Sequence, residues 1–321
     1  MSMILNGKFI KSELCKNAHG GTEFQSEKLV ANINKKLLSN FQIHVSRIRE
    51  NVIDRSKKQI LWLHDLPGDP EVQHLKDGGW RQYDKIVFVS EWQMQMYNLH
   101  LGIPYSHSAV IHNAIYPLQK IHPPKDGKVH LIYHTTPHRG LEILYNAFQE
   151  LCADFDNLEL DVFSSFKIYG WEQRDVQYQP LFDKLKDHEK INYHGSQPNN
   201  VVREQLQKSH IFAYPSIWLE TSCLSLMESM SAGLYNVHPN YGALPETAAN
   251  FSLMYQWQEN AYDHTIAFYD AMYEAISGLI DDNFNMDVKR LNMQKEYADI
   301  FYNWDLKKTE WTTMLENILE K

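Results

Sequence analysis

Residues 210–239, HIFAYPSIWLETSCLSLMESMSAGLYNVHP, contain in order a strand, a loop, a short helix and a second strand. The apolar runs at the two ends have the length of buried strands, and Gly233 is typical of the residue that follows the last turn of a helix. A helix that joins two neighbouring strands in this way returns the second strand parallel to the first. The stretch therefore predicts a domain of the α/β class.

Strands and helices alternate in the same way along the rest of the chain, in two series. We expect the strands of the first series at residues 3–10, 42–48, 59–64, 85–90 and 108–112, and its helices at 22–39 and 91–101. We expect the strands of the second series at residues 129–134, 158–165, 190–195, 210–216 and 234–239, with helices at 139–152, at 223–233 and at the end of the chain. The segment between the two series, residues 114–128, is rich in proline and charge, which is typical of a linker.

The length of 321 residues suits two domains of ordinary size. Short apolar strands that alternate with helices favour parallel sheets covered on both faces. We therefore predict two Rossmann-like α/β domains that face a cleft. The predicted parts are an N-terminal domain at 1–113, a linker at 114–128, a second domain at 129–302 and a C-terminal helix at 303–321 that returns to the first domain. The apolar face of this last helix is formed by Trp311, Met314, Leu315, Ile318 and Leu319.

Composition restricts the class of partner and the compartment. The formal net charge of −9 argues against nucleic acid as a partner. No apolar run approaches the roughly 20 residues that a membrane span needs, although peripheral contact with a membrane stays open. The first residues lack the long apolar stretch of a secretory signal and the three cysteines are widely spaced, so we expect a cytoplasmic protein. The 16 histidines include no H-E-x-x-H pair and the triplet at 154–156, DFD, reads as a solvated turn, so we expect no metal.

In an open parallel sheet, ligands bind beyond the carboxyl ends of the strands, so the loops that follow strands carry the candidate residues. Gly20 and Gly21 precede the first expected helix, where glycines let a backbone approach a ligand and free N–H groups meet an anion; a flexible loop is the other interpretation. His64 and Asp65 follow a strand and either point into the crevice or form a structural turn. The absence of a G-x-G-x-x-G motif weakens the case for a nicotinamide or flavin cofactor.

A third loop contains Thr135, Thr136 and Arg139, between the first strand of the second domain and a helix. Hydroxyl groups and a guanidinium in such a loop can hold a phosphate. A helix cap beside a surface arginine is the alternative interpretation, and the spacing alone does not decide between the two.

The glutamates Glu220 and Glu228 lie eight residues apart, the first in a loop and the second in the helix that follows. The free N–H groups of the helix start lie between them. Loop and helix can therefore form one site, with a partly positive helix start for a diphosphate and a carboxylate on either side for hydroxyl groups. A sugar nucleotide has the same order of parts, with its diphosphate between the hydroxyl groups of the sugar and those of the ribose. Two solvated surface glutamates are the simpler interpretation of the spacing alone.

Together these motifs resemble the retaining glycosyltransferases of the GT-B fold, family 4, also called group 1. The E-x7-E motif of that family appears as ETSCLSLME, within YPSIWLETSCLSLMESMSAGLYNVHPNYGALPET at 214–247. HTTPHRGLEILYNAF at 134–148 resembles the motif that opens the family's second domain. VIHNAI at 110–115 resembles the segment before the family's interdomain linker, and HGGTE at 19–23 resembles its N-terminal glycine loop. The resemblance is specific across residues 130–250 and looser across 1–113, a half that is short for the family.

The resemblance implies a GT-B fold with a shortened N-terminal domain, and it implies roles for individual residues. Glu220 would bind hydroxyl groups of the donor sugar, His64 would face that sugar, and Arg139 would neutralise the leaving diphosphate, so these three are the implied catalytic residues. The implied donor-binding residues are Gly20, Gly21, Thr135, Thr136, His194, Thr221, Ser222, Cys223, Leu224, Ser225 and Glu228. Among them, Glu228 would bind the ribose and His194 would lie near the base.

Two positions depart from the family pattern. The family usually carries two basic residues after the first strand of its second domain, where this chain has Arg139 and, in the other place, His134. The Gly-Phe-Gly that is common after the first glutamate is replaced by Thr221-Ser222-Cys223. Both changes bear on how strongly a diphosphate is bound and on which donor fits.

The activity that the resemblance implies is transfer of a sugar, with retention, from a nucleotide-diphosphate sugar to a hydroxyl group of a glycan or other glycoconjugate. The transfer would proceed by front-face attack, without a metal or other cofactor. A non-catalytic protein that binds nucleotide sugars or glycans on a decayed GT-B scaffold is the alternative. A sugar-nucleotide epimerase of the same architecture is a third hypothesis.

Overall fold

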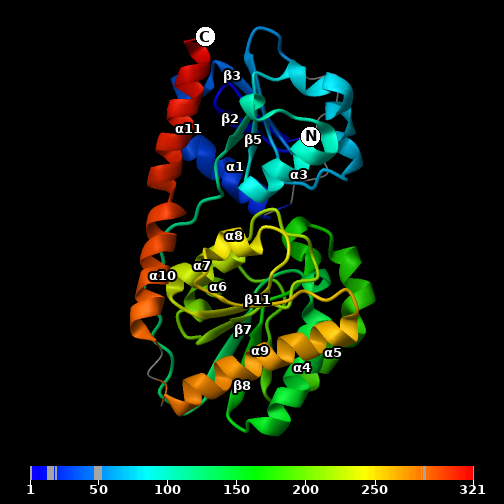
Figure 1. Cartoon of the computed structure of the whole chain (residues 1–321), viewed down its shortest axis with the longest axis vertical. Coiled ribbons are helices and arrows are strands. Elements are labelled where there is room, and N and C mark those ends of the chain that lie inside the picture. The colour runs from blue at the N-terminus through cyan, green and yellow to red at the C-terminus, as the bar shows by residue number, and fades with distance from the viewer. Residues whose placement is uncertain are drawn as a thin grey trace. The chain divides into compact units, whose positions relative to one another are not determined.

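The structure is a computed structural model, and it describes residues 2–12, 18, 20–46, 53–282, 284 and 287–320. Cys15, one of the three cysteines, and His19 of the glycine loop lie outside the described residues. The residue contacts divide the chain into two compact units (Figure 1). Unit 1 comprises Met1–Ala114 and Tyr302–Lys321, and unit 2 comprises Ile115–Phe301.

Unit 1 is built on a six-stranded sheet. Its strands are β1 (Ser2–Leu5), β2 (Lys8–Ile10), β3 (Phe41–Val45), β4 (Lys58–Trp62), β5 (Lys85–Phe88) and β6 (Ser108–Val110), in the spatial order β2-β1-β3-β4-β5-β6. Neighbours from β3 to β6 are parallel, whereas β1 is antiparallel to β2 and to β3. The helices are α1 (Gly21–Asn32), α2 (Lys35–Leu38), α3 (Glu91–Leu101) and α11 (Trp304–Leu319), with 3₁₀ turns at Pro70–Gln82 and Tyr105–His107.

Two elements predicted as single pieces are divided in the structure. The strand predicted for residues 3–10 is a hairpin, because Asn6 and Gly7 take φ values of 52° and 67°. A two-residue hairpin turn needs these positive values, and Asn-Gly is the dipeptide that favours them. The helix predicted for residues 22–39 is interrupted at Asn34, whose side chain accepts a hydrogen bond from the N–H of Lys36 at 2.8 Å and so starts α2.

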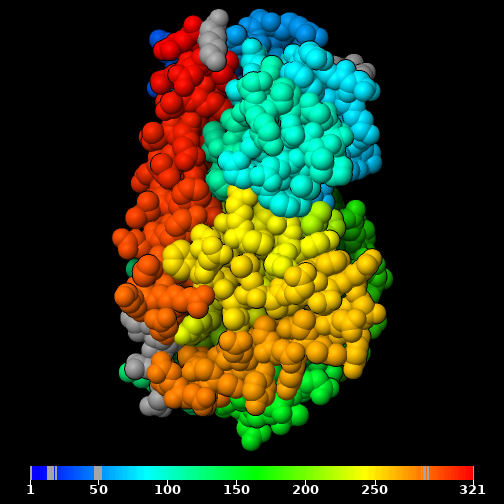
Figure 2. All heavy atoms as spheres, viewed as in Figure 1, coloured from blue at the N-terminus to red at the C-terminus, as the bar shows by residue number. Residues whose placement is uncertain are grey.

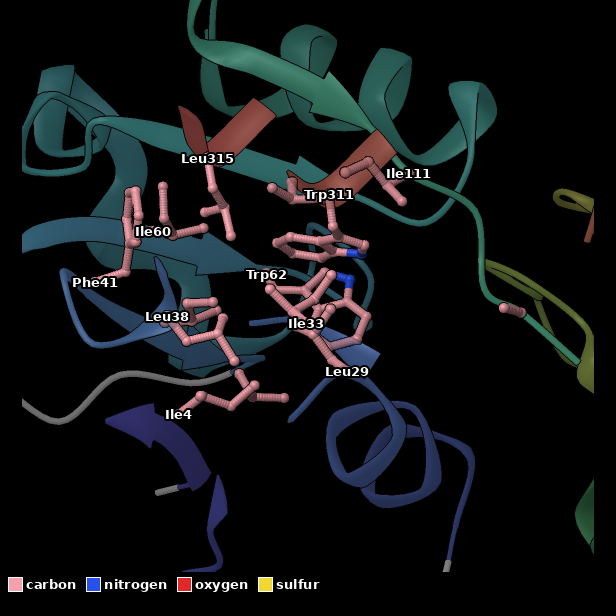
Figure 3. Packing of buried hydrophobic residues seen from close by; sticks show 14 of the residues in the cluster. Ile4, Leu29, Ile33, Leu38, Phe41, Ile60, Trp62, Ile111, Trp311 and Leu315 are labelled. Atoms are coloured by element: carbon pink, nitrogen blue, oxygen red, sulfur yellow. The ribbon is translucent and has the colours of Figure 1, made fainter. Parts of the chain in front are cut away.

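The core of unit 1 contains residues from both ends of the chain (Figure 3). Trp311 of α11 packs edge-on against Trp62 of β4, with ring centroids 5.0 Å apart. Leu315 and Ile318 of α11 belong to the same buried cluster, whereas Leu319 is 42% exposed. The last helix of the chain therefore contributes to the hydrophobic core of the unit that the first residues begin.

Unit 2 contains a second six-stranded sheet, in which every pair of neighbours is parallel. Its strands are β7 (Val129–Tyr133), β8 (Leu158–Val162), β9 (Ile191–Tyr193), β10 (Ile211–Ala213), β11 (Tyr235–Pro239) and β12 (Leu253–Tyr255), in the spatial order β12-β11-β10-β7-β8-β9. Its helices are α4 (Leu141–Asp154), α5 (Gln179–Asp187), α6 (Asn199–Leu206), α7 (Leu224–Ala232), α8 (Leu244–Ala248), α9 (Ala261–Asp281) and α10 (Val288–Phe301). The predicted fold class, two Rossmann-like α/β domains, is confirmed.

The α9 helix is an example of how the sheet of unit 2 is covered. It packs on α4 and on β11 and β12. Figure 2 shows its side chains as a band across the visible face of unit 2. Neither α9 nor any other helix in the described part of the chain combines the length and the apolar character that crossing a bilayer requires.

The strand order of unit 2 reverses between β7 and β10. From β7 the chain continues to β8 and β9 on one side, and from β10 it continues to β11 and β12 on the other. Two neighbouring strands whose connections leave in opposite directions open a crevice outside their carboxyl ends. The loops after β7 and β10 are therefore the place in this sheet where a ligand is expected.

We expect Trp311→Ala to lower the free energy of unfolding of unit 1 by about 3–5 kcal/mol, because the substitution leaves a cavity beside Trp62 that the packed core cannot fill. Chemical denaturation followed by circular dichroism measures the loss. Leu319→Ala on the same helix is the matched control and should change the transition little, because Leu319 is exposed. Equal transitions for Trp311→Ala and the unmodified protein would show that α11 does not support this core.

Candidate active site

Two loops meet at the switch point of unit 2. The first runs from β7 to α4 and the second from β10 to α7. Gly140, which starts α4, has φ +109°, and a Cβ atom there would lie 2.0 Å from the carbonyl oxygen of Pro215 in the second loop. Only glycine allows this approach without moving the backbone. The two loops are therefore held against each other by their main chains.

The side chains of Arg139 and Glu220 form an ion pair between these loops. Nη1 of Arg139 donates to Oε1 of Glu220, and the hydroxyl group of Tyr214 donates to the same oxygen. The Glu220 side chain is 4% exposed and that of Arg139 is 20% exposed. Burial acts to lower the pKa of Arg139, but Glu220 and, with smaller effects, Tyr169, Tyr214 and Cys223 together outweigh it and hold this pKa well above its ordinary value. Arg139 is therefore a fixed positive charge beside a buried acid.

The main chain of Glu220 is also held in place, by a hydrogen bond and by a close backbone contact. The N–H of Ala243 donates to the Glu220 carbonyl oxygen at 2.8 Å. Gly242, with φ +60°, lies so close that a Cβ atom would be 2.9 Å from the Glu220 nitrogen. The Gly-Ala-Leu-Pro-Glu stretch of the sequence thus packs directly behind the first glutamate. It supports the position of that carboxylate.

The start of α7 lies in the second loop, three residues after Thr221. Cys223 at the N-cap makes no side-chain capping hydrogen bond, and burial raises the pKa of its thiol, which keeps it neutral. The Ser222 hydroxyl is buried and has no hydrogen-bond partner within the described part of the chain. The Ser225 hydroxyl donates to the His134 carbonyl oxygen at 3.0 Å, which ties α7 to the first loop. Leu224 is the first residue of the helix, and a helix start of this kind suits an anion.

The first loop contains two further buried polar atoms. Oγ1 of Thr136 and Nε of Arg139 are buried, and neither has a hydrogen-bond partner among the residues described. Thr135 is partly exposed beside them. Buried polar groups are normally hydrogen-bonded, so unpartnered ones beside a helix start indicate a place for a ligand.

His134 does not replace the missing basic residue of this loop. Burial lowers the pKa of His134 to about 3, so its ring is neutral near pH 7. The pKa of His138 is lowered to about 4, first by burial and then by the charges of Arg139 and Arg174. Arg139 is therefore the positive side chain of the loop at neutral pH.

Glu228 lies on α7 and is paired with a residue that the sequence analysis did not single out. Nη1 of Arg203 on α6 donates to Oε1 of Glu228 at 2.7 Å, and Nδ2 of Asn199 lies 3.5 Å from its Oε2. Burial raises the pKa of Glu228, and Arg203 opposes the rise. A carboxylate on a buried helix needs a cationic partner, but the sequence does not say which arginine supplies it.

His194 follows β9 at the same edge of the sheet. Its Nε2 lies 2.6 Å from Oδ1 of Asp161, whose other oxygen accepts from Nε2 of Gln205 at 2.7 Å. Its ring stacks on Phe163 with centroids 4.3 Å apart. Asp161, Gln205 and Phe163 were not among the predicted site residues, and together they fix the orientation of the imidazole.

The remaining predicted residues belong to unit 1. Gly20 is the N-cap of α1, and Gly21 begins the helix. His64 follows β4, its ring lies 4.6 Å from that of Trp62, and burial lowers its pKa to about 3. The carbonyl oxygen of Asp65 accepts from Gln93 and Tyr97. The loop after β4 is thus held rigidly inside unit 1.

Within the described ranges, no three histidine, cysteine, aspartate or glutamate side chains are grouped as metal ligands would be. Asp154, the first residue of the DFD triplet, ends α4 and accepts a hydrogen bond from the hydroxyl group of Tyr269 at 2.5 Å. It lies at the end of the helix opposite to the one that Gly140 starts.

Fold and site together define an α/β protein of the GT-B glycosyltransferase class. Residues 118–298, more than half of the chain, match the family described as "Glycosyl transferases group 1", and the chain belongs to this family. The suspected family is confirmed.

Two curated relatives are subunits of one kind of transferase. The chain is 21% identical over 166 residues to the phosphatidylinositol N-acetylglucosaminyltransferase gpi3 subunit of Schizosaccharomyces pombe, a match that covers 52% of this chain and 33% of the relative. It is 21% identical over 194 residues to the GPI3 subunit of Saccharomyces cerevisiae, covering 58% of this chain and 41% of the relative. The chain thus matches less than half the length of either relative.

Solved structures of similar fold extend over both units. A glycosyltransferase from Rickettsia africae has a TM-score of 0.66 at 16% identity and covers 97% of this chain and 84% of its own. HepE from Anabaena, in complex with UDP-glucose, has a TM-score of 0.61 at 14% identity, and the match covers 91% of this chain and 77% of HepE. At these identities the similarity shows the fold alone.

We expect Arg139→Met to lower the free energy of unfolding of unit 2 by about 3–5 kcal/mol, because it leaves the Glu220 carboxylate buried without its cationic partner. Thermal and denaturant unfolding measure the change. The double variant Arg139→Met/Glu220→Gln should recover most of the loss, and Arg290→Met, at an exposed arginine, should cause little. If Arg139→Met is as stable as Arg290→Met, the pair does not hold the loops together.

The depressed pKa of His134 predicts that unit 2 loses stability in acid. The folded state keeps this ring neutral down to about pH 3, whereas an unfolded chain protonates it below about pH 6.5. Unfolding is therefore favoured as the pH falls from about 6.5, by about 2 kcal/mol at pH 5. In His134→Phe the difference in unfolding free energy between pH 7 and pH 5 should shrink by about this amount, and in His122→Phe, at an exposed position, it should not. An unchanged pH dependence in His134→Phe contradicts this account.

Proposed function

We propose that the protein is a retaining glycosyltransferase that moves a sugar from a nucleotide-diphosphate sugar to a hydroxyl group of a glycan or other glycoconjugate. The observation that carries the proposal is the buried ion pair of Arg139 and Glu220 at the switch point of unit 2, beside the start of α7. A fixed cation, an oriented carboxylate and a helix start form the set of groups that a sugar diphosphate requires.

In this proposal, the diphosphate lies at the start of α7. The Ser222 hydroxyl, the Thr136 hydroxyl and Nε of Arg139 have no hydrogen-bond partner among the described residues, and they support this assignment because each can donate to phosphate oxygens. Negative charge develops on the diphosphate as the bond to the sugar breaks. Groups that are already oriented stabilise this charge by several kcal/mol without having to move. We propose that they do so without a metal ion.

Glu220 is proposed to bind a hydroxyl group of the donor sugar. Arg139 and Tyr214 both donate to its Oε1 and hold the carboxylate in one orientation. The acceptor hydroxyl attacks the anomeric carbon from the face that the diphosphate leaves. The bond from that carbon to the phosphate oxygen breaks with its electron pair, the new bond to the acceptor oxygen forms, and the acceptor proton passes to the departing phosphate. The configuration is retained.

The other parts of the donor are assigned by the same reasoning. Glu228 is proposed to accept hydrogen bonds from the ribose, and His194, fixed by Asp161, to lie beside the base. Gly20, Gly21 and His64 are the proposed contribution of unit 1. Cys152 and Cys223 are free thiols, which supports placing the protein in the cytoplasm.

Relatives suggest which donors to test first. The gpi3 relatives are named as subunits of an N-acetylglucosaminyltransferase, and HepE was solved with UDP-glucose. UDP-N-acetylglucosamine and UDP-glucose therefore lead the series of candidate donors, followed by GDP-mannose and ADP-glucose.

The test is release of nucleoside diphosphate from these four donors, with and without an oligosaccharide acceptor. We expect Glu220→Gln to lower turnover by at least about 100-fold, because the oriented carboxylate is lost where the sugar reacts, while nucleoside diphosphate binding changes little. Glu150→Gln, at an exposed position on α4, should retain full turnover.

Three results separate the alternatives. Turnover that depends on Glu220 and inverts the anomeric configuration would contradict the retaining mechanism. Binding of a nucleotide sugar with no turnover for any acceptor would favour the non-catalytic binding protein. A product in which the sugar is still attached to the nucleotide but has changed configuration would favour the epimerase.

A further inference from the structure

Arg203 contacts a proposed ligand-binding carboxylate and a stretch of main chain at the same time. Its Nη1 donates to Oε1 of Glu228 at 2.7 Å. Its Nη2 donates to the carbonyl oxygen of Tyr116 at 2.8 Å and reaches that of Pro117 at 3.3 Å. Tyr116 and Pro117 lie where the chain enters unit 2, which begins at Ile115. The main chain at Tyr116 and Pro117 therefore fixes the guanidinium of Arg203, and this guanidinium fixes the carboxylate of Glu228.

The Glu228 carboxylate is in a place where it needs such a partner. Its side chain is 10% exposed and that of Arg203 is 21% exposed. An ionised carboxylate in these surroundings is costly unless it is paired. Asn199, one helical turn before Arg203 on α6, lies at 3.5 Å from the other carboxylate oxygen, a distance at the limit of a hydrogen bond. Oε1 is thus engaged strongly and Oε2 only weakly.

The segment at residues 116–118, whose carbonyl oxygens at 116 and 117 accept hydrogen bonds from Arg203, is itself hydrogen-bonded to α7. The N–H of Leu118 donates to the Ser231 hydroxyl oxygen at 2.9 Å, and Nζ of Lys295 donates to the carbonyl oxygens of both Leu118 and Ser231. Ser231 lies three residues after Glu228 and therefore on the same side of α7. The guanidinium, the entry segment and the helix form one frame around the carboxylate. These contacts fix the orientation of the Glu228 carboxylate, whereas a cation that only balanced its charge would leave the carboxylate free to rotate.

We propose that Arg203 is a positioning residue that holds the Glu228 carboxylate in one orientation and directs its Oε2 at the ribose hydroxyl groups, so that the site prefers ribonucleotides to nucleotides lacking these groups. The inference rests on the proposed function, in which Glu228 meets the ribose of the donor. A carboxylate oxygen that is fixed and weakly engaged is a strong acceptor for a hydroxyl donor. A ligand without the hydroxyl groups leaves that buried acceptor unpaired, and this is a large source of discrimination.

The test compares ribose with dideoxyribose in binding. Affinities of UDP, GDP and ADP and of their 2′,3′-dideoxy counterparts are measured by isothermal titration calorimetry for the unmodified protein, Arg203→Ala and Arg203→Lys. We expect the unmodified protein to prefer the ribose form of the nucleotide that it binds by about tenfold or more. In Arg203→Ala the preference should fall below threefold, with the affinity for the dideoxy form unchanged within threefold. A purely structural arginine would weaken both forms equally.

Controls make each outcome decisive. Arg290→Ala, which removes an arginine that donates to the Ser252 carbonyl oxygen, should keep the full preference. If Arg203→Ala does not fold, Arg203→Lys carries the test, because lysine keeps the charge but cannot contact the carboxylate and the carbonyl groups together; its preference should fall at least threefold. A full preference in a folded Arg203 variant overturns this inference and leaves the proposed function intact. Failure of the unmodified protein to bind any of the three diphosphates overturns both.

Discussion

The buried contact between Arg139 and Glu220 is the interaction on which the arrangement of unit 2 at its switch point depends. Removing two charges from water costs several kcal/mol for each, and a good geometry with further hydrogen bonds is needed to offset that cost. Tyr214 supplies one such bond to the carboxylate. The glycines at 140 and 242 let the surrounding main chains come close enough for the pair to be enclosed. Backbone approach and charge pairing therefore stabilise the same junction.

Around this junction the sequence departs from the pattern of its family at two places. With His134 neutral, one guanidinium carries the positive charge of the first loop. The residues that replace the family's Gly-Phe-Gly add the hydroxyl groups of Thr221 and Ser222, and that of Ser222 is buried without a partner in the described structure. The loss of one cationic donor is thus accompanied by the gain of a neutral donor at the helix start.

Much of the fold could be predicted because its signals are local. The helix Glu91–Leu101 has the predicted bounds, and the strand–helix–strand unit around α7 has the predicted order. The hairpin at Asn6-Gly7 and the cap at Asn34 also have local signals, which the helical and strand periodicities of the flanking residues outweighed in the prediction. The 3₁₀ segments Phe166–Tyr169 and Glu172–Tyr178 have no apolar periodicity, so their conformation depends on tertiary contacts.

The site was predictable to the extent that it follows from strand order. Loops after parallel strands meet at one edge, and the contact between Arg139 and Glu220 is of this kind. Arg203, on a helix, and Asp161, within a strand, could not be predicted in the same way. Arg203 reaches Glu228 from a helix 25 residues earlier, and nothing in its own neighbourhood marks it. Pairing of this type is decided by how α6 and α7 pack, which the spacing of residues within each helix does not specify.

The two glutamates of the E-x7-E motif are each neutralised by an arginine from a different element, Glu220 by Arg139 and Glu228 by Arg203. Each buried carboxylate therefore has its charge balanced by a neighbouring guanidinium, and the two pairs add no net negative charge to the site. A diphosphate that enters such a site does not meet two uncompensated acids. It meets the positive end of α7 and the remaining donors of Arg139, whose Nε is unpartnered among the described residues. A guanidinium has five N–H donors, so Arg139 can hold Glu220 and a phosphate oxygen at once, and the charge that orients the acid is the charge that would receive the leaving group.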